Sequence, residues 1–326
     1  MLMRLPVLLI LLVSVPAHLR GQELHLISYA GISAGTAPLW LTKDQGLFDK
    51  YGLNAGIVYL AGGARGIQAL VAGSTHFYTG DGIAPMSAML RGADVVVVGV
   101  SENKIPGGLT TRKDIQKPSD LRGKRIGIVN FGGSNELSVV MALRKWNIQR
   151  EAVTLLISGG VPERLSALVS SGIDASPLPP PQSFQAPRMG MNTLIDFADI
   201  PTFPQTSLAV RRSFLEKNRE TVRRFIQAYS EGIHVFMTNK EKALATYRKW
   251  LRQQDAKILE ESYNYYQHKF SLPPRIVRGE GLCLAHQMTA ERVGKEVMES
   301  DMERFVDEKV TEQLEKEGFF KRLSGN

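Results

Sequence analysis

The sequence is poor in cysteine, with Cys283 the only one among 326 residues. A single cysteine excludes a disulfide framework within the chain and any metal or redox site built on a CxxC pair. The six histidines show no metal-ligand spacing, and none stands beside a candidate nucleophile. We therefore expect no metal, no cofactor and no enzymatic activity. Because a catalytic triad can assemble from distant residues, this argument weakens an enzyme interpretation without excluding it.

Charge and hydrophobicity exclude two further classes of protein. The 40 lysines and arginines exceed the 32 acidic residues by eight, and the excess is scattered along the chain. Such a diffuse excess fits solubility or a mild preference for anionic partners, and it does not predict nucleic-acid binding. Beyond residue 21, no apolar run approaches the ~18 residues that a membrane-spanning helix needs. The length allows one large domain or two ordinary ones.

Residues 1–21, MLMRLPVLLILLVSVPAHLRG, have the pattern of a signal peptide. After an early arginine, residues 5–15 form an apolar core that is too short for a stable membrane anchor. Small residues at Val15 and Ala17 predict cleavage after Ala17, with cleavage after Gly21 as the alternative. An uncleaved anchor is the competing interpretation. We expect a soluble mature protein in the periplasm or another extracytoplasmic space.

The mature chain alternates predicted strands with predicted helices up to about residue 211. The expected strands are His25–Tyr29, Gly56–Leu60, Asp94–Val100, Arg125–Val129, Val153–Ser158 and Ser207–Val210. The expected helices are 36–50, 67–72, 84–91 and 135–145. Strands that alternate with helices indicate an α/β fold with parallel-rich sheets. After residue 211 the sequence is helical and rich in charge, which indicates helices that pack on an existing sheet.

One internal repeat has an offset of 98 residues. Residues 62–77, GGARGIQALVAGSTHF, and residues 159–175, GGVPERLSALVSSGIDA, share a glycine pair, an Ala-Leu-Val stripe and a glycine-containing stop. Repeats of 20–50 residues would indicate a solenoid, whereas two copies at this larger offset predict two similar lobes. Chance convergence of two ordinary β-loop-α units is the alternative, since this stripe is common in protein cores.

Five loops between predicted strands and helices are rich in glycine, serine and threonine. Glycine lets the backbone approach a ligand closely, and exposed N–H groups at helix N-termini favour anions. In open α/β sheets such loops gather at the carboxyl ends of the strands, so together they predict a binding cleft. Taken singly, Thr36, Ser134 and Asn135 are better explained as helix caps. The loops are Gly31–Pro38, Gly62–Gly66, Gly80–Pro85, Asn130–Glu136 and Gly159–Glu163.

Four side chains in these loops suggest the chemistry of a ligand. Arg65 would bind a carboxylate, sulfonate or phosphate, or else be a solvated surface arginine. Asp81 would accept from an amine or amide N–H, or else pair with Arg65 or cap the next helix. Phe131 would stack on a planar ligand or anchor its loop, and Glu136 would complete a helix cap. Basic and acidic groups together predict a small polar organic ligand, and a zwitterion would satisfy both.

Several motifs follow one another in a characteristic order. They are APLW at 37–40, QGLFDKYGL at 45–53, GIQALVAG at 66–73, DLRGKRIG at 120–127, RLSAL at 164–168 and LEKEGFF at 314–320. In this order they resemble the periplasmic substrate-binding proteins of ABC importers, within the nitrate/sulfonate/taurine and thiamine-pyrimidine branch called NMT1/THI5-like. The resemblance covers essentially the whole mature chain, and it specifies the fold better than the ligand.

This resemblance implies a type II periplasmic-binding-protein-like fold, with two α/β lobes, two crossing strands and a ligand cleft between the lobes. Lobe one would comprise residues 22–110 and 205–326, and lobe two would comprise residues 111–204. By position the resemblance also implies a set of ligand-binding residues. Phe131 is added to this set because its ring would stack on a planar ligand. The set is Ser33, Ala34, Thr36, Gly63, Ala64, Arg65, Gly80, Asp81, Phe131, Gly132, Gly133, Ser134, Asn135 and Leu178.

The resemblance further implies a monomer that closes on its ligand by a hinge motion and delivers it to an ABC permease, without a reaction. One alternative is an enzyme like those of thiamine-pyrimidine synthesis, whose cysteine-rich motif is missing here. Another is an exported ligand sensor, which the sequence does not separate from a transport protein. Sulfonates, carboxylates, zwitterions and pyrimidine-like molecules all remain open as ligands.

Overall fold

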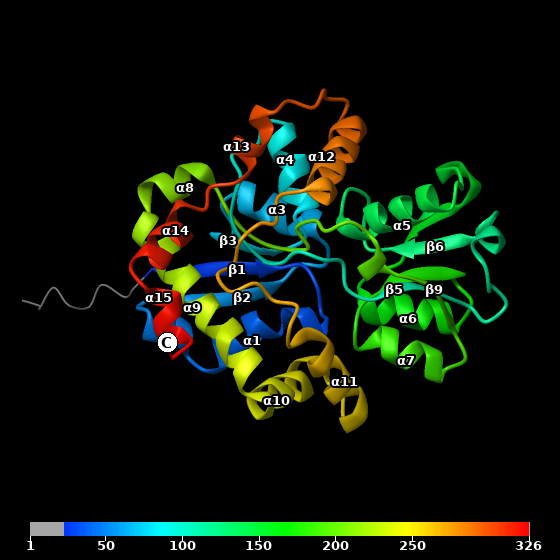
Figure 1. Cartoon of the computed structure of the whole chain (residues 1–326), viewed down its shortest axis with the longest axis horizontal. Coiled ribbons are helices and arrows are strands. Elements are labelled where there is room, and N and C mark those ends of the chain that lie inside the picture. The colour runs from blue at the N-terminus through cyan, green and yellow to red at the C-terminus, as the bar shows by residue number, and fades with distance from the viewer. Residues whose placement is uncertain (1–22, 326) are drawn as a thin grey trace, which may run out of the picture.

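A computed structural model describes residues 23–325 of the chain. Two lobes lie side by side, and each is built around one five-stranded sheet (Figure 1). The expected α/β class with parallel-rich sheets is confirmed. The predicted signal peptide at 1–21 lies outside the described residues.

The first sheet is parallel except for one strand. Its order is β2 (Ala55–Tyr59), β1 (His25–Tyr29), β3 (Phe77–Gly80), β10 (Thr206–Val210) and β4 (Val96–Glu102). Strand β10 runs antiparallel to both of its neighbours. The other four strands point the same way, so their carboxyl ends meet at one edge of the sheet.

The second sheet repeats this plan. Its order is β7 (Thr154–Ile157), β6 (Arg125–Ile128), β8 (Ala175–Leu178), β5 (Gly108–Thr111) and β9 (Asn192–Asp196). Strand β6 is parallel to β7 and β8, whereas β5 is antiparallel to β8 and β9. In each sheet, the antiparallel strand is therefore the one that arrives from the other lobe.

The chain crosses between the lobes twice. Residues 103–107 connect β4 to β5, and residues 197–205 lead from the second sheet back to β10. The predicted lobe limits stay a prediction, and the limit at residue 110 falls inside β5.

The 98-residue repeat corresponds to two equivalent units of structure. The first unit contains α3 (Gly63–Val71) followed by β3, and the second contains α6 (Val161–Val169) followed by β8. Each helix and each strand of the second unit begins 98 residues after its counterpart. Because β3 and β8 also occupy the central position of their sheets, the repeat reflects two similar lobes rather than chance.

Helices cover both faces of each sheet (Figure 1). Those of the first lobe are α1 (Ala37–Asp44), α2 (Leu47–Lys50), α3, α4 (Ile83–Leu90), α8 (Arg212–Lys217), α9 (Arg219–Thr238), α10 (Lys240–Leu251), α13 (Ser300–Phe305), α14 (Lys309–Lys316) and α15 (Phe319–Leu323). Those of the second lobe are α5 (Ser134–Lys145), α6 and α7 (Gln182–Arg188). The single helix predicted at 36–50 is interrupted, because Gly46 adopts a left-handed φ of 64° between α1 and α2.

Two further helices, α11 (Ala256–Tyr266) and α12 (Glu280–Val293), contact both lobes. On one side, the Arg188 guanidinium of α7 lies 2.8 Å from the Glu261 carboxylate of α11. On the other side, Arg292 of α12 forms an ion pair with Glu136 of α5. The two helices therefore connect the lobes beside the crossing segments.

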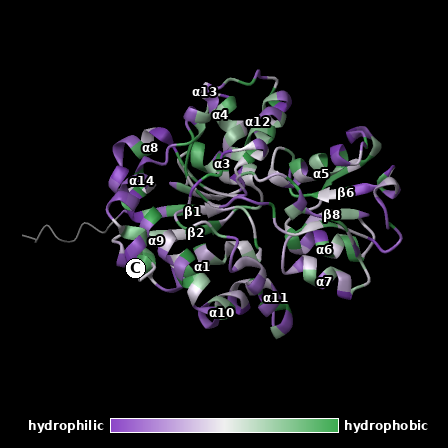
Figure 2. Ribbon diagram, viewed as in Figure 1, coloured by the Kyte–Doolittle hydropathy of each residue, from purple (hydrophilic) through white to green (hydrophobic). Residues whose placement is uncertain are grey.

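Hydrophobic residues concentrate in the sheets and at the helix faces that cover them, whereas outer helices such as α8 and α14 carry hydrophilic residues (Figure 2). Among residues 23–325, no helix combines the length and the apolar character that crossing a membrane requires.

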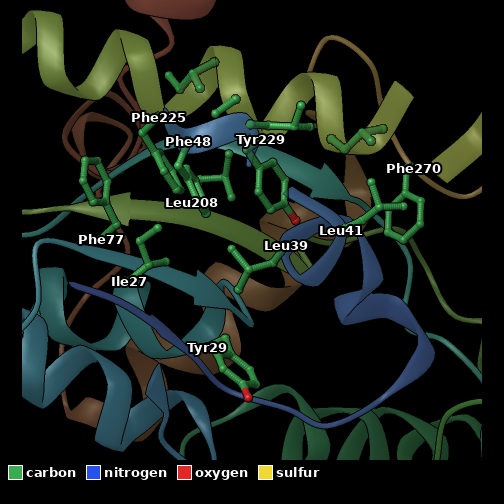
Figure 3. Packing of buried hydrophobic residues seen from close by; sticks show 14 of the residues in the cluster. Ile27, Tyr29, Leu39, Leu41, Phe48, Phe77, Leu208, Phe225, Tyr229 and Phe270 are labelled. Atoms are coloured by element: carbon green, nitrogen blue, oxygen red, sulfur yellow. The ribbon is translucent and has the colours of Figure 1, made fainter. Parts of the chain in front are cut away.

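The largest core lies between α9 and the first sheet, where Figure 3 shows Phe48, Phe77 and Phe225 close together. Phe225 is fully buried, and its ring centroid lies 4.2 Å from that of Phe77. We expect Phe225→Ala to lower the free energy of unfolding by about 3–5 kcal/mol, as truncation of a buried phenylalanine usually does. Urea unfolding would measure this loss. The control is Val169→Ala, at a half-exposed position of α6, and a similar loss in both variants would contradict this assignment of the core.

Candidate ligand-binding site between the lobes

A cavity of about 120 Å³ lies between the two lobes. Loops that follow β1, β3, β6 and β8 line it, so it lies at the carboxyl ends of parallel strands in both sheets. The first lobe also contributes Glu102 at the end of β4, and the second lobe contributes Arg164 of α6. The fold therefore places the cavity where the sequence predicts a cleft.

Eight of the fourteen predicted site residues line this cavity. They are Ser33, Thr36, Gly63, Gly80, Asp81, Gly133, Ser134 and Asn135. Their contact with a ligand stays a prediction, since their placement shows only that the loops come together.

The remaining six predicted residues do not line the cavity. Ala34 and Leu178 are fully buried in the protein, and Leu178 is the last residue of β8. Arg65 is exposed on α3. The other three, which lie along a separate groove beside Arg292, are Ala64, Phe131 and Gly132.

Three helices, α3, α5 and α6, begin at the cavity. Their N-cap residues are Gly62, Gly133 and Gly160, which have no side chain to bind the first N–H groups. At α5 the Asp81 carboxyl group accepts from the Ser134 N–H instead, so α3 and α6 are the helices that begin here without a side-chain cap. At Gly62, φ is 83° and a β-carbon would lie 2.4 Å from the Asn130 side-chain oxygen, so only glycine fits. Uncapped N–H groups and the helix dipoles make this part of the cavity favourable for an anion.

Arg164 is a buried cation at the cavity. Its guanidinium donates to Ser176 Oγ at 3.0 Å, to the Gly159 carbonyl at 2.9 Å and to the Pro177 carbonyl at 3.2 Å. These bonds use three of its five N–H donors, and no carboxylate among residues 23–325 forms a salt bridge with it. Burial lowers the pKa of Arg164 to about 10, so the side chain still carries a positive charge at neutral pH.

The repeat explains how this arginine fits inside the lobe. Arg164 and Ser176 occupy the positions that Gly66 and Tyr78 occupy in the first lobe, 98 residues earlier. A β-carbon at Gly66 would lie 2.7 Å from the Tyr78 ring, so the tyrosine fills the space above a glycine. In the second lobe the large residue is on the helix and the small residue is on the strand. At the edge of the cavity, the second lobe therefore has the guanidinium of Arg164 where the first lobe has the phenol of Tyr78.

Asp81 holds helix N-termini rather than Arg65. Its Oδ1 accepts from the Ala84 N–H at 3.0 Å, which caps α4. Burial raises the pKa of Asp81, and backbone hydrogen bonds from Ala84, Ser134 and Ile83 lower it in part. Because Ser134 begins α5, this carboxyl group joins the two lobes. The capping role that the sequence offered as an alternative therefore accounts for its contacts.

Glu102 is the second acidic residue of the cavity, and it is not among the residues predicted from the sequence. Its carboxyl group is 2% exposed and accepts from Thr206 Oγ1 at 3.0 Å. Burial raises the pKa of Glu102 to about 8, although the Thr206 hydrogen bond and the charge of Lys269 act in the opposite direction. Three tyrosines line the same cavity, namely Tyr29, Tyr229 and Tyr266.

The two lobes touch each other around the cavity. The Ala34 N–H of the first lobe donates to the Pro180 carbonyl of the second lobe at 3.1 Å. The Gly107 N–H, in a crossing segment, donates to the Tyr265 hydroxyl of α11 at 3.0 Å. These contacts hold the two lobes together beside the cavity.

A cluster of possible metal ligands lies at the opposite edge of the first sheet. Glu23, His25 and His76 offer ligand atoms that all lie within 4.8 Å of one another, because β1 and β3 are neighbouring strands. However, His76 Nδ1 accepts from the Leu26 N–H at 3.2 Å, so the ring proton is on Nε2, which faces Glu23. The spacing of the histidines in the sequence gives no sign of this cluster. The expected absence of a metal stays a prediction.

The NMT1/THI5-like family profile matches residues 33–243, which is well over half of the chain and includes both Glu102 and Arg164. The chain belongs to the NMT1/THI5-like family. Among proteins similar to this chain, a Brucella abortus protein named as a binding protein is 28% identical over 246 residues, covering 73% of this chain and 75% of the relative. The taurine-binding periplasmic protein of Escherichia coli is 26% identical over 57% of this chain and 55% of its own length.

A solved structure supports the same fold for this NMT1/THI5-like chain. The periplasmic aliphatic sulphonate-binding protein SsuA of Escherichia coli superposes with a TM-score of 0.67 at 21% identity. The match covers 83% of this chain and 87% of SsuA. The two-lobed α/β arrangement is therefore that of periplasmic binding proteins, as the sequence motifs predicted.

Proposed function

We propose that this protein is an extracytoplasmic solute-binding protein that captures a small molecule with an acid group between its lobes and delivers it to an ABC import permease. The observation that carries the proposal is the joint presence of Arg164 and the uncapped N-termini of α3 and α6 at one cavity. Both features favour a sulfonate, carboxylate or similar acid group. The names of the relatives from Brucella abortus and Escherichia coli support binding rather than catalysis.

The size of the cavity limits the ligand. A cavity of roughly 150 Å³ holds one benzene molecule, and the cavity here has about 120 Å³. This arrangement of the lobes therefore suits a molecule of about that size, such as a short sulfonate or amino acid, and it leaves little room for a thiamine pyrimidine. A periplasmic location, a monomeric state and the permease partner are part of the same proposal.

A thermal-shift screen of residues 22–326 tests the proposal, after unfolding and refolding to remove any carried ligand. The panel contains sulfonates, nitrate, carboxylates, amino acids and thiamine precursors. A ligand at 100 times its dissociation constant adds about 2.7 kcal/mol to the folded state, which raises the melting temperature by several degrees. We expect selective shifts with small anions. Shifts confined to thiamine precursors, or to molecules without an acid group, would contradict the proposal.

A further inference from the structure

Glu102 is a buried acid with little to balance a negative charge. Thr206 Oγ1 is its hydrogen-bond donor, and no lysine, arginine or histidine nitrogen among residues 23–325 forms a salt bridge with it. Transfer of a carboxylate out of water is costly unless a cation or several hydrogen bonds compensate. The protein's own groups therefore leave Glu102 either protonated or in need of a positively charged partner.

The surroundings of Glu102 favour a cation. The side chains of Tyr29, Tyr229 and Tyr266 line the same cavity, and all three are at least 94% buried. Aromatic rings attract ammonium groups through their quadrupole, most strongly where water is excluded. The charge of Lys269 acts on Glu102, but Lys269 does not line the cavity, and its Nζ lies 4.8 Å from the centroid of the Tyr265 ring.

The other acid of the cavity is already engaged. Asp81 accepts the N–H groups that begin α4 and α5, so its carboxylate is held by the two lobes themselves. Glu102 is therefore the acidic group that remains for a ligand. The cavity then has one unpaired cation, Arg164, on the second lobe and one uncompensated acid, Glu102, on the first.

We propose that the ligand is a small zwitterion whose ammonium group binds Glu102 among the tyrosines and whose acid group binds Arg164 and the helix N-termini. This inference rests on the proposed function and narrows its class of ligand. A molecule that carries both charges neutralises one buried group on each lobe, so its binding favours the closed arrangement by differential affinity. An anion without an amine would leave Glu102 without its positive partner.

Isothermal titration calorimetry with matched pairs of probes tests the inference. The pairs are taurine with ethanesulfonate, β-alanine with propionate, and 2-aminoethylphosphonate with ethylphosphonate, all titrated into the refolded mature protein. In at least one pair we expect the amine-bearing member to bind at least about thirtyfold more tightly, as loss of one partner from a buried charge pair predicts.

The variant Glu102→Gln assigns the preference to this side chain. Its amide oxygen still accepts from Thr206, so we expect the variant to fold, which thermal unfolding checks. It should bind the amine-bearing member at least about tenfold more weakly while the amine-free member changes little. The matched control is Glu308→Gln, which alters a partly buried carboxyl group outside the cavity that accepts from the Ile276 N–H. The control should keep the affinities of the unchanged protein.

The outcomes separate the two proposals. Equal or tighter binding of the amine-free members overturns the zwitterion inference and leaves the proposed function in place. The inference also fails if Glu102→Gln folds and retains the full preference for amines. If no member of any pair binds, the zwitterion inference is overturned, whereas the thermal-shift panel decides the proposed function. The comparison of pairs on the unchanged protein decides the question even if Glu102→Gln does not fold.

Discussion

Replacement of Arg164 by methionine is expected to weaken ligand binding at least about thirtyfold. Removal of one member of a buried, hydrogen-bonded charge pair costs about 2–5 kcal/mol, and each 1.4 kcal/mol is a factor of ten in the dissociation constant. Arg164 is fully buried and has N–H donors left after its three bonds to the protein. Calorimetry with the ligand that gives the largest thermal shift would measure the loss.

The loss has to be separated from damage to the second lobe. Methionine leaves Ser176 Oγ and the carbonyls of Gly159 and Pro177 without the donors they have now, so we expect a lower melting temperature as well. Arg150→Met is the matched control, because Arg150 also donates to a carbonyl of the second lobe, at Val153, but lies outside the cavity. A folded Arg164→Met protein with unchanged affinity would remove Arg164 from the site.

The affinity for an ammonium-bearing ligand is expected to rise about fiftyfold between pH 6 and pH 8. Burial raises the pKa of Glu102 to about 8, so the group is largely protonated at pH 6 when no ammonium group is bound. A bound ammonium group requires the carboxylate, so Glu102 must lose its proton on binding at low pH. Each unit below the pKa costs a factor of ten, and the affinity levels off above pH 8. Calorimetry across this range gives the profile.

Other ionisable groups at the cavity must be considered when this pH profile is assigned to Glu102. The pKa of Asp81 is also raised, which contributes in the same direction as Glu102. Burial raises the pKa of Tyr229 and of Tyr266, so both stay neutral, and Arg164 stays charged. The variant Glu102→Gln should flatten most of the profile. A profile that keeps its slope in this variant would assign the titration to another group.

Six of the ten strands in the described residues, among them β1 and the valine-rich β4, could be predicted from the sequence, whereas four could not. The valine-rich run predicted at 94–100 is β4, and β1 has the limits predicted for it. The strands β3, β5, β8 and β9 were missed, because FYTG, GLTT, ASPL and NTLID are short and contain glycine, proline or polar residues. Their strand conformation depends on pairing with neighbours that are distant in the sequence.

The cavity was predicted through its glycine-rich loops, and of its charged side chains the sequence suggested Asp81 but neither Glu102 nor Arg164. Glu102 ends a run of valines, and Arg164 lies in a helical segment, PERL, that has the composition of a solvated face. The signal that could have found Arg164 is the repeat, because its counterpart Gly66 faces the sheet in the first lobe. Arg65, the arginine that the loops suggested, is exposed on α3 instead.

The position of β10 imposes an order on assembly of the chain. Every strand of the second sheet lies within residues 108–196, so that sheet can form as soon as this segment is available. The first sheet has β10 inserted between β3 and β4, although β10 begins only at Thr206. Strands β1 to β4 therefore cannot form the complete sheet until the segment that contains β10 has been synthesised. Until then, the place between β3 and β4 is unfilled. A chain interrupted before residue 206 would leave the edges of β3 and β4 open to aggregation.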